Sequence, residues 1–284
     1  MALPIKVSLM RGRAKRKLEI QEPEGADLSS LIRRTTALSG KSFTGAMMAG
    51  VMVDRADLSN SDLSLADFSE SEVIETRLTG ACLKNSLFLG ATLSLTNAEK
   101  ADFRFARLIE ARIRQCRFCG ANFSQAAFHS ARIEECEFSE ADLSGAEFIH
   151  ARVRLSRFVS ANFSGAQLNG AAFTGCNLTK TVFVRARCNR VSFASCVLDR
   201  ADFTDADLRD ADLTGADLGG AMLRQVRLAG ARLFAADLRG ADLTDARELT
   251  SPQLQQARTD STTILPNGKH GPFRRNSGAE RPKN

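Results

Sequence analysis

The sequence has few of the residues on which most catalytic sites depend. It contains only three histidines, His129, His150 and His270, and they are widely separated in the chain. None has an acid or nucleophile beside it at a spacing typical of a catalytic pair. We therefore expect no enzymatic activity, and the sequence implies no cofactor and no small-molecule substrate.

Long apolar stretches are also missing. The longest run without a charged or strongly polar residue, GAMMAGVMV at 45–53, is far shorter than the roughly 20 residues that cross a bilayer. The basic N-terminal residues are not followed by an apolar segment with a small-residue cleavage site, so a signal peptide is not expected. The predicted location is cytoplasmic.

The chain is dominated by a five-residue repeat. From Leu38 to Leu243 every fifth residue is a centre, usually Phe or Leu, and a small residue stands two places before it. Five residues at 3.6 per turn would rotate the centre by about 140° per repeat, so no helical face forms. Short extended sides joined by corners fit instead. Glycine two places after the centre, as at Gly40, Gly120 and Gly215, suits such a corner.

A second period, of twenty residues, sets the number of sides. The residues that follow it are Phe103, Phe123, Phe163, Phe183 and Phe203, and also Cys116, Cys136, Cys176 and Cys196. Four repeats per coil would stack like on like at roughly 4.8 Å. The 42 repeats then give about ten coils and a rod about 50 Å long.

Repeats such as ADLSL, ADFSE, ANFSG, ADLTG and ADLRG resemble those of the pentapeptide-repeat family, whose pattern is A-(D/N)-L-x-x. The resemblance covers about three quarters of the chain. It implies the all-β fold of that family, a right-handed quadrilateral β-helix, and the handedness follows from the family alone. An open β-helix exposes sheet edges, so short capping segments are expected at both ends.

Four segments are predicted: 1–35, a basic N-terminal segment and cap; 36–245, the β-helix; 246–266, a C-terminal cap with a short helix; and 267–284, a disordered basic tail. In the first, PIKVSLM and LEI predict a hairpin with the charges of RGRAKRK on its turn, and a basic arm for nucleic acid or lipid is the alternative. In the third, Ser251 is predicted as the helix N-cap with Pro252 at the first helical position. Leu249 and Leu254 would close the last coil.

The cysteines predict neither a metal site nor a disulfide. Four of them, at 116, 136, 176 and 196, replace alanine at inward positions. The CRFC spacing of Cys116 and Cys119 places one thiol inside and the other outside the coil, so the two should not share an ion. We expect buried thiols that pack as small hydrophobic groups.

The charge pattern yields the candidate interaction surface. The chain carries +6, but 36–245 holds 24 basic and 26 acidic residues, so the basic excess lies in the terminal segments. Arg112, Arg132 and Arg152 should stack in one column about 5 Å apart, where like charges repel. Two neighbouring columns alternate in sign and predict ion ladders. These ladders are Arg114–Glu134–Arg154 and Arg117–Glu137–Arg157.

An acidic belt is the alternative surface. Asp202, Asp207, Asp212 and Asp217 each precede a centre on four successive sides. The family resemblance implies that Asp or Asn at this position is ordinary repeat chemistry.

Two functions stay open. A regular solenoid offers an extended surface, which favours a rigid scaffold for a protein partner. The alternative, implied by the resemblance, is a DNA mimic, because some pentapeptide-repeat proteins resemble duplex DNA in size and negative charge and bind DNA gyrase. The near-neutral charge of 36–245 does not suit that role. Direct nucleic-acid or membrane-surface binding through the basic ends is less favoured, and no aromatic residue interleaves with the charges of the N-terminal segment.

Overall fold

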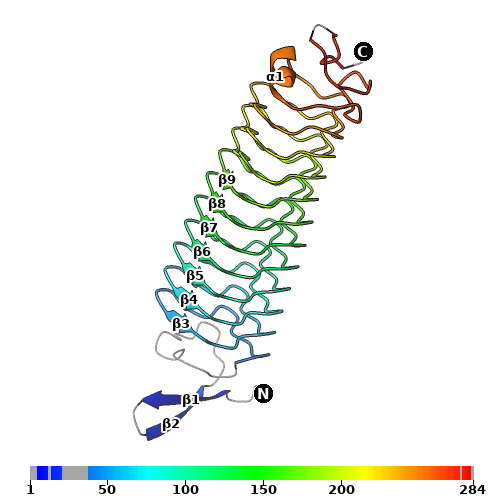
Figure 1. The fold of residues 1–284 in the computed structure, drawn as a ribbon. Coiled ribbons are helices and arrows are strands. Elements are labelled where there is room, and N and C mark those ends of the chain that lie inside the picture. Colours follow the sequence, from blue (N-terminus) through cyan, green and yellow to red (C-terminus); the bar gives the residue numbers. More distant parts are fainter. Residues whose placement is uncertain (1–4, 12–13, 21–37, 276, 283–284) are drawn as a thin grey trace.

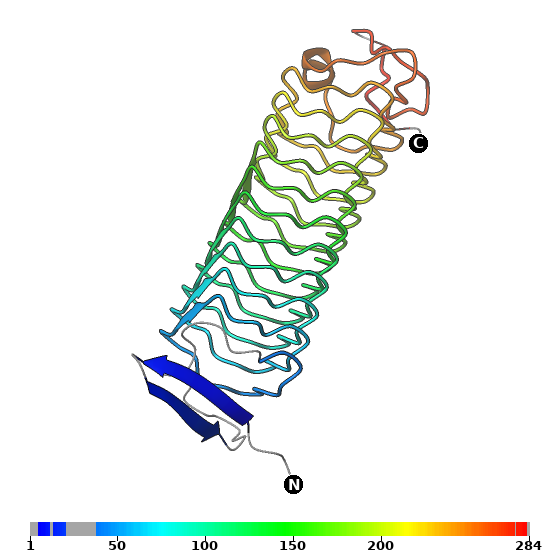
Figure 2. The same ribbon diagram turned by 60° about the horizontal axis from the view of Figure 1, so that its bottom comes forward.

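The chain forms a rod of stacked coils (Figure 1) in a computed structural model that describes residues 5–11, 14–20, 38–275 and 277–282. The tilted view of Figure 2 shows the coils following one another from the N-terminal hairpin to the helix near the C-terminus. The rod is therefore a single solenoid, as the five-residue repeat predicts.

Neighbouring coils are held in register by parallel pairing at a separation of twenty residues. On one side the bridges lead from Ser42↔Asp62 to Met222↔Asp242, which is ten steps of one coil each. On another side they extend into regular strands, and we call that side the strand face. Its strands are β3 (Met52–Asp54), β4 (Glu72–Ile74), β5 (Thr92–Ser94), β6 (Arg112–Arg114), β7 (Arg132–Glu134), β8 (Arg152–Arg154) and β9 (Ala172–Thr174). The strands span seven coils, whereas the bridges continue along the rod.

The centre of each repeat and the small residue before it fill the interior. Phe103 and Phe123 are fully buried, and their rings stack in adjacent coils with centroids 4.5 Å apart. Rings from neighbouring sides meet edge-on, as in Phe118 and Phe123 at 5.2 Å. The stacked and edge-on contacts are the geometries that aromatic pairs prefer. The twenty-residue period thus builds a continuous aromatic core.

Each corner requires a left-handed residue two places after the centre. Gly120 has a φ of +62° there, as the sequence predicts for glycine at this place. Many corners hold other residues in the same conformation, for example Asn60 with a φ of 56°. A non-glycine residue pays about 1–2 kcal/mol for this region. Coil stacking therefore stabilises corners that the local sequence would not form alone.

Asp or Asn before the centre has a local structural role. One carboxylate oxygen of Asp142 accepts the backbone N–H of Ser144 at 3.0 Å, and the side-chain oxygen of Asn162 accepts that of Ser164 at 3.0 Å. Such side-chain-to-backbone bonds stabilise turns. They explain why these two residue types recur at this position.

The N-terminal hairpin consists of β1 (Ile5–Arg11) and β2 (Ala14–Ile20), paired antiparallel. Figures 1 and 2 show it beyond the first coil of the rod. Because β2 begins at Ala14, Lys15, Arg16 and Lys17 lie within a strand and not on the turn, which differs from our prediction. Each of the seven residues of β1 pairs with one residue of β2, so β2 must also be seven residues long. A strand of that length includes the basic residues that follow the turn.

The C-terminal end is closed by α1 (Ser251–Gln256). Its N-cap is Thr250 and not Ser251, because Gln253 lies three residues after Thr250 and accepts its backbone N–H at 2.8 Å. The Gln253 amide also donates to the carbonyls of Leu228 (2.8 Å) and Ala231 (2.9 Å) in the last coils. Leu254 is 1% exposed. The helix thus satisfies polar groups and covers apolar side chains at the open end.

The segment after α1 rejoins the stack before the chain ends. Ile264 pairs in parallel with Asp242 and antiparallel with His270. Ala279 is only 4% exposed, and its carbonyl accepts the N–H of Asn267 at 3.3 Å. This differs from the disordered tail that composition predicts for 267–284. The composition of 267–284, polar and rich in Gly, indicated disorder. A few apolar residues are nevertheless enough to order such a segment where the end of a coil exposes a surface to be covered.

Candidate functional site

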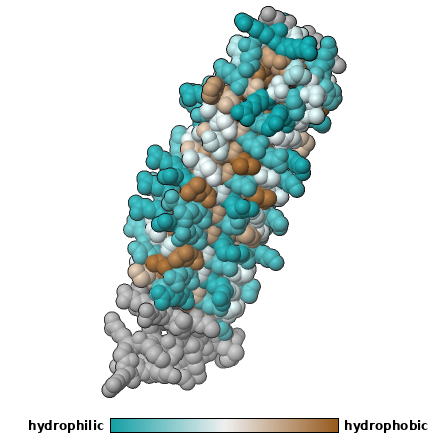
Figure 3. All heavy atoms as spheres, viewed as in Figure 1, coloured by the Kyte–Doolittle hydropathy of each residue, from teal (hydrophilic) through white to brown (hydrophobic). Residues whose placement is uncertain are grey.

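The strand face carries the predicted arginine column. Arg112 and Arg132 are directly paired in register, as are Arg132 and Arg152, and all three side chains are exposed. Among the described residues no carboxylate lies within 4.0 Å of their guanidinium nitrogens. In the view of Figure 3, hydrophilic side chains cover much of the coloured surface of the rod, with hydrophobic groups between them. Three like charges at strand spacing repel one another unless another group neutralises them.

The two predicted ion ladders form only in part. Arg114 lies 4.0 Å from Glu134 and 3.9 Å from Glu135, whereas Arg154 makes no ion pair within 4.0 Å among the described residues. In the second ladder, Arg157 contacts Glu137 at 3.1 Å. The prediction of complete ladders is therefore wrong.

Arg117 shows why the ladders are incomplete. It contacts Glu99 at 2.6 Å, eighteen residues earlier, and not Glu137 in its own column. His129 and Glu147 contact each other across the same separation, 2.5 Å apart, so His129 is not the isolated histidine that its sequence position suggested. A long side chain reaches the diagonal neighbour in the next coil as easily as the residue directly beneath it.

The acidic belt lies on four successive sides, as predicted, but its carboxylates are engaged locally. Asp202 accepts the N–H and the hydroxyl of Thr204 at 2.9 and 2.6 Å. Asp207 accepts the Nε of Arg209 at 2.8 Å, and the hydrogen bonds from that arginine hold the pKa of Asp207 below its usual value. The backbone N–H groups of Thr214 and Gly219 are bound in the same way, by Asp212 and Asp217 at 3.0 and 3.1 Å. The belt therefore stabilises its own turns.

Four of the seven cysteines belong to a buried column whose polar role their inward positions in the sequence do not reveal. We call it the inner ladder: Thr76, Thr96, Cys116, Cys136, Ser156, Cys176 and Cys196, each at most 2% exposed. Each member follows a centre of the strand face by three residues. Cys119 is half-buried on the outer side, and burial raises the pKa of its thiol. Cys116 and Cys119 thus lie on opposite sides of the coil wall.

The inner ladder compensates for a change of turn. At most other corners the N–H three residues after the centre donates to the centre's carbonyl, as Ala106 does to Phe103 at 3.0 Å. In the described chain this bond is missing after β3–β9. The Thr76 hydroxyl instead donates to the Val53 carbonyl at 3.0 Å, and Cys136 donates to that of Ile113 at 3.6 Å. A buried carbonyl without a donor is costly, so hydroxyls and thiols replace alanine here.

Replacing Ser156 with alanine should lower the free energy of unfolding by about 1–3 kcal/mol. Its hydroxyl accepts the N–H of Cys136 at 3.1 Å and donates to the carbonyl of Arg154 at 2.8 Å, and both groups would lose their partner. Urea denaturation measures the change. Ser156→Cys should recover much of the loss, and Ser144→Ala on the outer surface should change little. Equal stability of Ser156→Ala and Ser144→Ala would contradict the role of the inner ladder.

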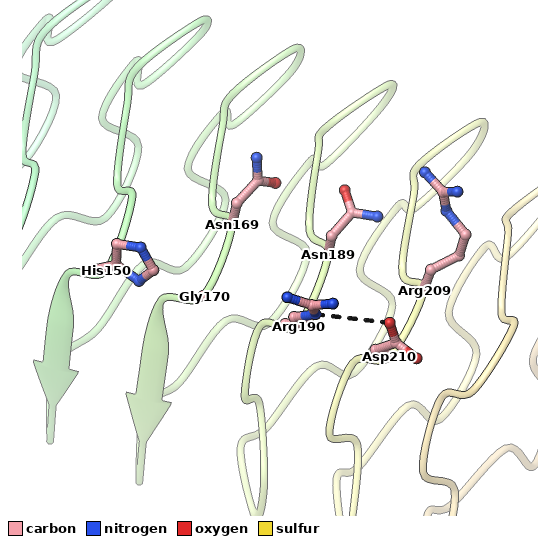
Figure 4. A pocket seen from close by; sticks show the side chains of 7 residues that line it. All are labelled: His150, Asn169, Gly170, Asn189, Arg190, Arg209 and Asp210. Carbon is pink, nitrogen blue, oxygen red and sulfur yellow. Dashed lines mark ion pairs between the residues drawn. The ribbon is translucent and has the colours of Figure 1, made fainter.

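One hollow, of about 430 Å³, opens on the side before the strand face (Figure 4). It is lined by His150, Asn169, Gly170, Asn189, Arg190, Arg209 and Asp210. Arg190 lies 3.8 Å from Asp210, and Oδ1 of Asn169 is buried without a hydrogen-bond partner among the described groups. None of the predicted interaction residues lines this hollow, so the sequence signals and the cavity do not coincide.

Two further features are absent from the described residues. No helix there has the length and apolar character needed to cross a membrane. No group of three or more His, Cys, Asp or Glu side chains there is arranged to hold a metal ion.

Comparison with protein-family models gives matches along the rod. The model described as pentapeptide repeats (8 copies) matches 53–85, 86–125, 121–158 and 211–247, and the pentapeptide repeat region model matches 155–223. Both models describe repeats. A search of curated proteins found no match.

Three of the solved structures that are similar to this chain illustrate the range of the matches. HetL from the cyanobacterium Nostoc, involved in heterocyst differentiation regulation, is 28% identical over 81% of this chain and 89% of its own, with a TM-score of 0.42. A form of QnrB1, a plasmid-mediated fluoroquinolone resistance protein, is 24% identical over 68% and 87%, with a TM-score of 0.41. A thylakoid-lumen protein of Arabidopsis thaliana is 28% identical over 41% and 70%, with a TM-score of 0.18.

Family assignment rests on the repeat models, which cover the rod from 53 to 247, together with the four-sided coils in twenty-residue register. The alanine, aspartate or asparagine, and leucine of each repeat have the structural roles described above. The chain belongs to the pentapeptide-repeat family.

Proposed function

We propose that this protein is a non-enzymatic scaffold that binds a protein partner through the strand face. The observation that carries the proposal is the column of Arg112, Arg132 and Arg152, stacked in register and without carboxylates within 4.0 Å among the described residues. Arg154 adds a fourth such charge one column away. An acidic partner surface would neutralise charges that the fold itself leaves in mutual repulsion.

The location is part of the same proposal. All seven cysteines are free thiols, which fits a reducing compartment such as the cytoplasm.

Changing Arg112, Arg132 and Arg152 together to glutamate should abolish capture of the native partner by the purified, tagged protein. Folding should persist, because the three side chains are exposed and the buried residue of each strand is unchanged. In the matched control, three other arginines are changed to glutamate. They are Arg107, Arg187 and Arg227, which precede a centre on another side of the coil and are also exposed. That variant should still capture the partner. Equal capture by both variants would contradict the proposal.

The DNA-mimic function would give the opposite pattern. It requires the acidic belt, and Asp202, Asp207, Asp212 and Asp217 can be changed to asparagine without losing the turn bond, since Asn122 already accepts it at the same position. Inhibition of gyrase supercoiling by the purified protein, lost in the Asp→Asn variant and kept in the Arg→Glu variant, would replace the scaffold with the mimic. Under the scaffold proposal the Asp→Asn variant keeps partner capture.

A further inference from the structure

Charge changes sign along the strand face. Its first two strands carry Asp54 and Glu72, the third strand is neutral, and the next three carry Arg112, Arg114, Arg132, Arg152 and Arg154 with Glu134 among them. All lie on one parallel sheet. The same face therefore holds an acidic end and a basic block, separated by the neutral strand β5.

The register fixes two outward columns. The first column consists, in order along the rod, of Met52, Glu72, Thr92, Arg112, Arg132 and Arg152. The second column consists of Asp54, Ile74, Ser94, Arg114, Glu134 and Arg154. Consider a second copy related to the first by a two-fold axis that is parallel to the strands and lies between β5 and β6. The two strand faces then oppose each other, and each column faces the same column of the second copy in reverse order. Then β3 opposes β8, β4 opposes β7 and β5 opposes β6.

This arrangement matches opposite charges. In the first column Arg132 would meet Glu72 of the second copy, and in the second column Arg154 would meet Asp54. A two-fold interface uses the same surface on both copies, so each pair forms twice. Parallel rods would instead place arginine over arginine and are disfavoured.

We propose that a second copy of this chain binds the strand face, with the two rods antiparallel. The inference rests on the proposed function, because it names the partner of the same arginine column. It also gives Arg132, the middle member of the column, a carboxylate that its own chain does not supply: Glu72 lies on the same face three coils away, where no side chain of that chain can bridge the gap.

Exposed apolar side chains border this surface. Met52 is 43% exposed at the start of β3, and Leu95 and Leu155 are 51% and 57% exposed at the corners after β5 and β8. In the antiparallel arrangement Met52 faces Arg152, whose aliphatic stem can pack on it. The covered sheet is about 24 Å long, five strand spacings, which is small for a stable interface. We therefore expect a weak dimer that salt dissociates.

Sedimentation of the full-length chain tests this from low micromolar concentration to about 500 µM, at low and high salt. We expect a monomer–dimer equilibrium that weakens with salt. Arg132→Glu and Glu72→Arg should each weaken dimerisation roughly tenfold or more, because each variant places like charges together twice. The double variant Glu72→Arg/Arg132→Glu should restore it, since both pairs form again with reversed polarity. Arg107→Glu on another side should leave it unchanged.

Failure of the dimer and failure of the scaffold can be told apart. A chain that stays monomeric at every concentration, while capture of another protein still depends on Arg112, Arg132 and Arg152, overturns the second-copy inference and keeps the proposed function. Dimerisation that ignores both single variants, or that the double variant fails to restore, also overturns the inference. Loss of both self-association and arginine-dependent capture overturns the proposed function as well.

Discussion

Phe123→Ala is expected to lower the free energy of unfolding by about 3–5 kcal/mol. The Phe123 ring is fully buried and has neighbours in its own coil and in both adjacent coils. Its ring centroid lies 4.5 Å from that of Phe103, 5.2 Å from Phe118, 5.3 Å from Phe128 and 5.6 Å from Phe138. Alanine would leave a cavity that the backbone, fixed by coil-to-coil hydrogen bonds, cannot collapse to fill.

The loss should also change how the rod unfolds. In a solenoid each coil is stabilised mainly by its neighbours, so a weak coil in the middle uncouples the two ends. Urea denaturation should show a lower midpoint and a shallower or divided transition. Phe105→Ala is the control, because that ring is 49% exposed at a corner, and it should change stability by less than about 0.5 kcal/mol. Similar curves for the two variants would mean that the aromatic stack does not stabilise the rod.

Ending the chain at Asp245 should cause aggregation or end-to-end association. The shortened rod would lose α1, the two bonds from Gln253 to Leu228 and Ala231, and the pairing of Ile264 with Asp242. The last coil would then expose its sheet edge and its apolar interior together. Light scattering and sedimentation measure the change.

A chain ending at Pro266 is the matched control. It keeps α1 and Ile264 and loses only later contacts, such as the bond from Gly271 to Thr263 at 2.6 Å. We expect it to keep the association state of the full-length chain with a modest loss of thermal stability. If both shortened chains matched the full-length protein, residues 246–266 would not act as the cap. The converse result, aggregation of both, would assign the cap to the residues after Pro266.

The candidate site shows how far a repeat sequence predicts its own surface. Once the period of twenty is known, the stacking of Arg112, Arg132 and Arg152 follows from counting, and the structure has that register. The ion pairs did not follow, because pairing depends on the reach of flexible side chains and not on the column. Arg117 pairs with Glu99, a diagonal neighbour eighteen residues earlier, and a count in steps of twenty does not predict such a pair.

The sequence by itself determined the fold. A centre every fifth residue, a small residue two places before it and a corner two places after it predict four-sided coils, because only a four-sided coil returns like residues to the same place after twenty. The handedness of the coils was implied by the family resemblance alone. The Asp or Asn before the centre acts within its own repeat, so its role is also local.

Only the tertiary structure decided which turn each corner adopts and what then binds the freed groups. The corners after β3–β9 release a carbonyl, and for five of these strands its donor comes from the next coil, 23 residues later, as Thr76 does for Val53. The end of the chain is similar: Gln253 caps carbonyls 22 and 25 residues earlier, and Ala279 is buried although its surroundings in sequence are polar. These choices depend on unsatisfied groups that exist only after the coils have stacked, so no local pattern could reveal them.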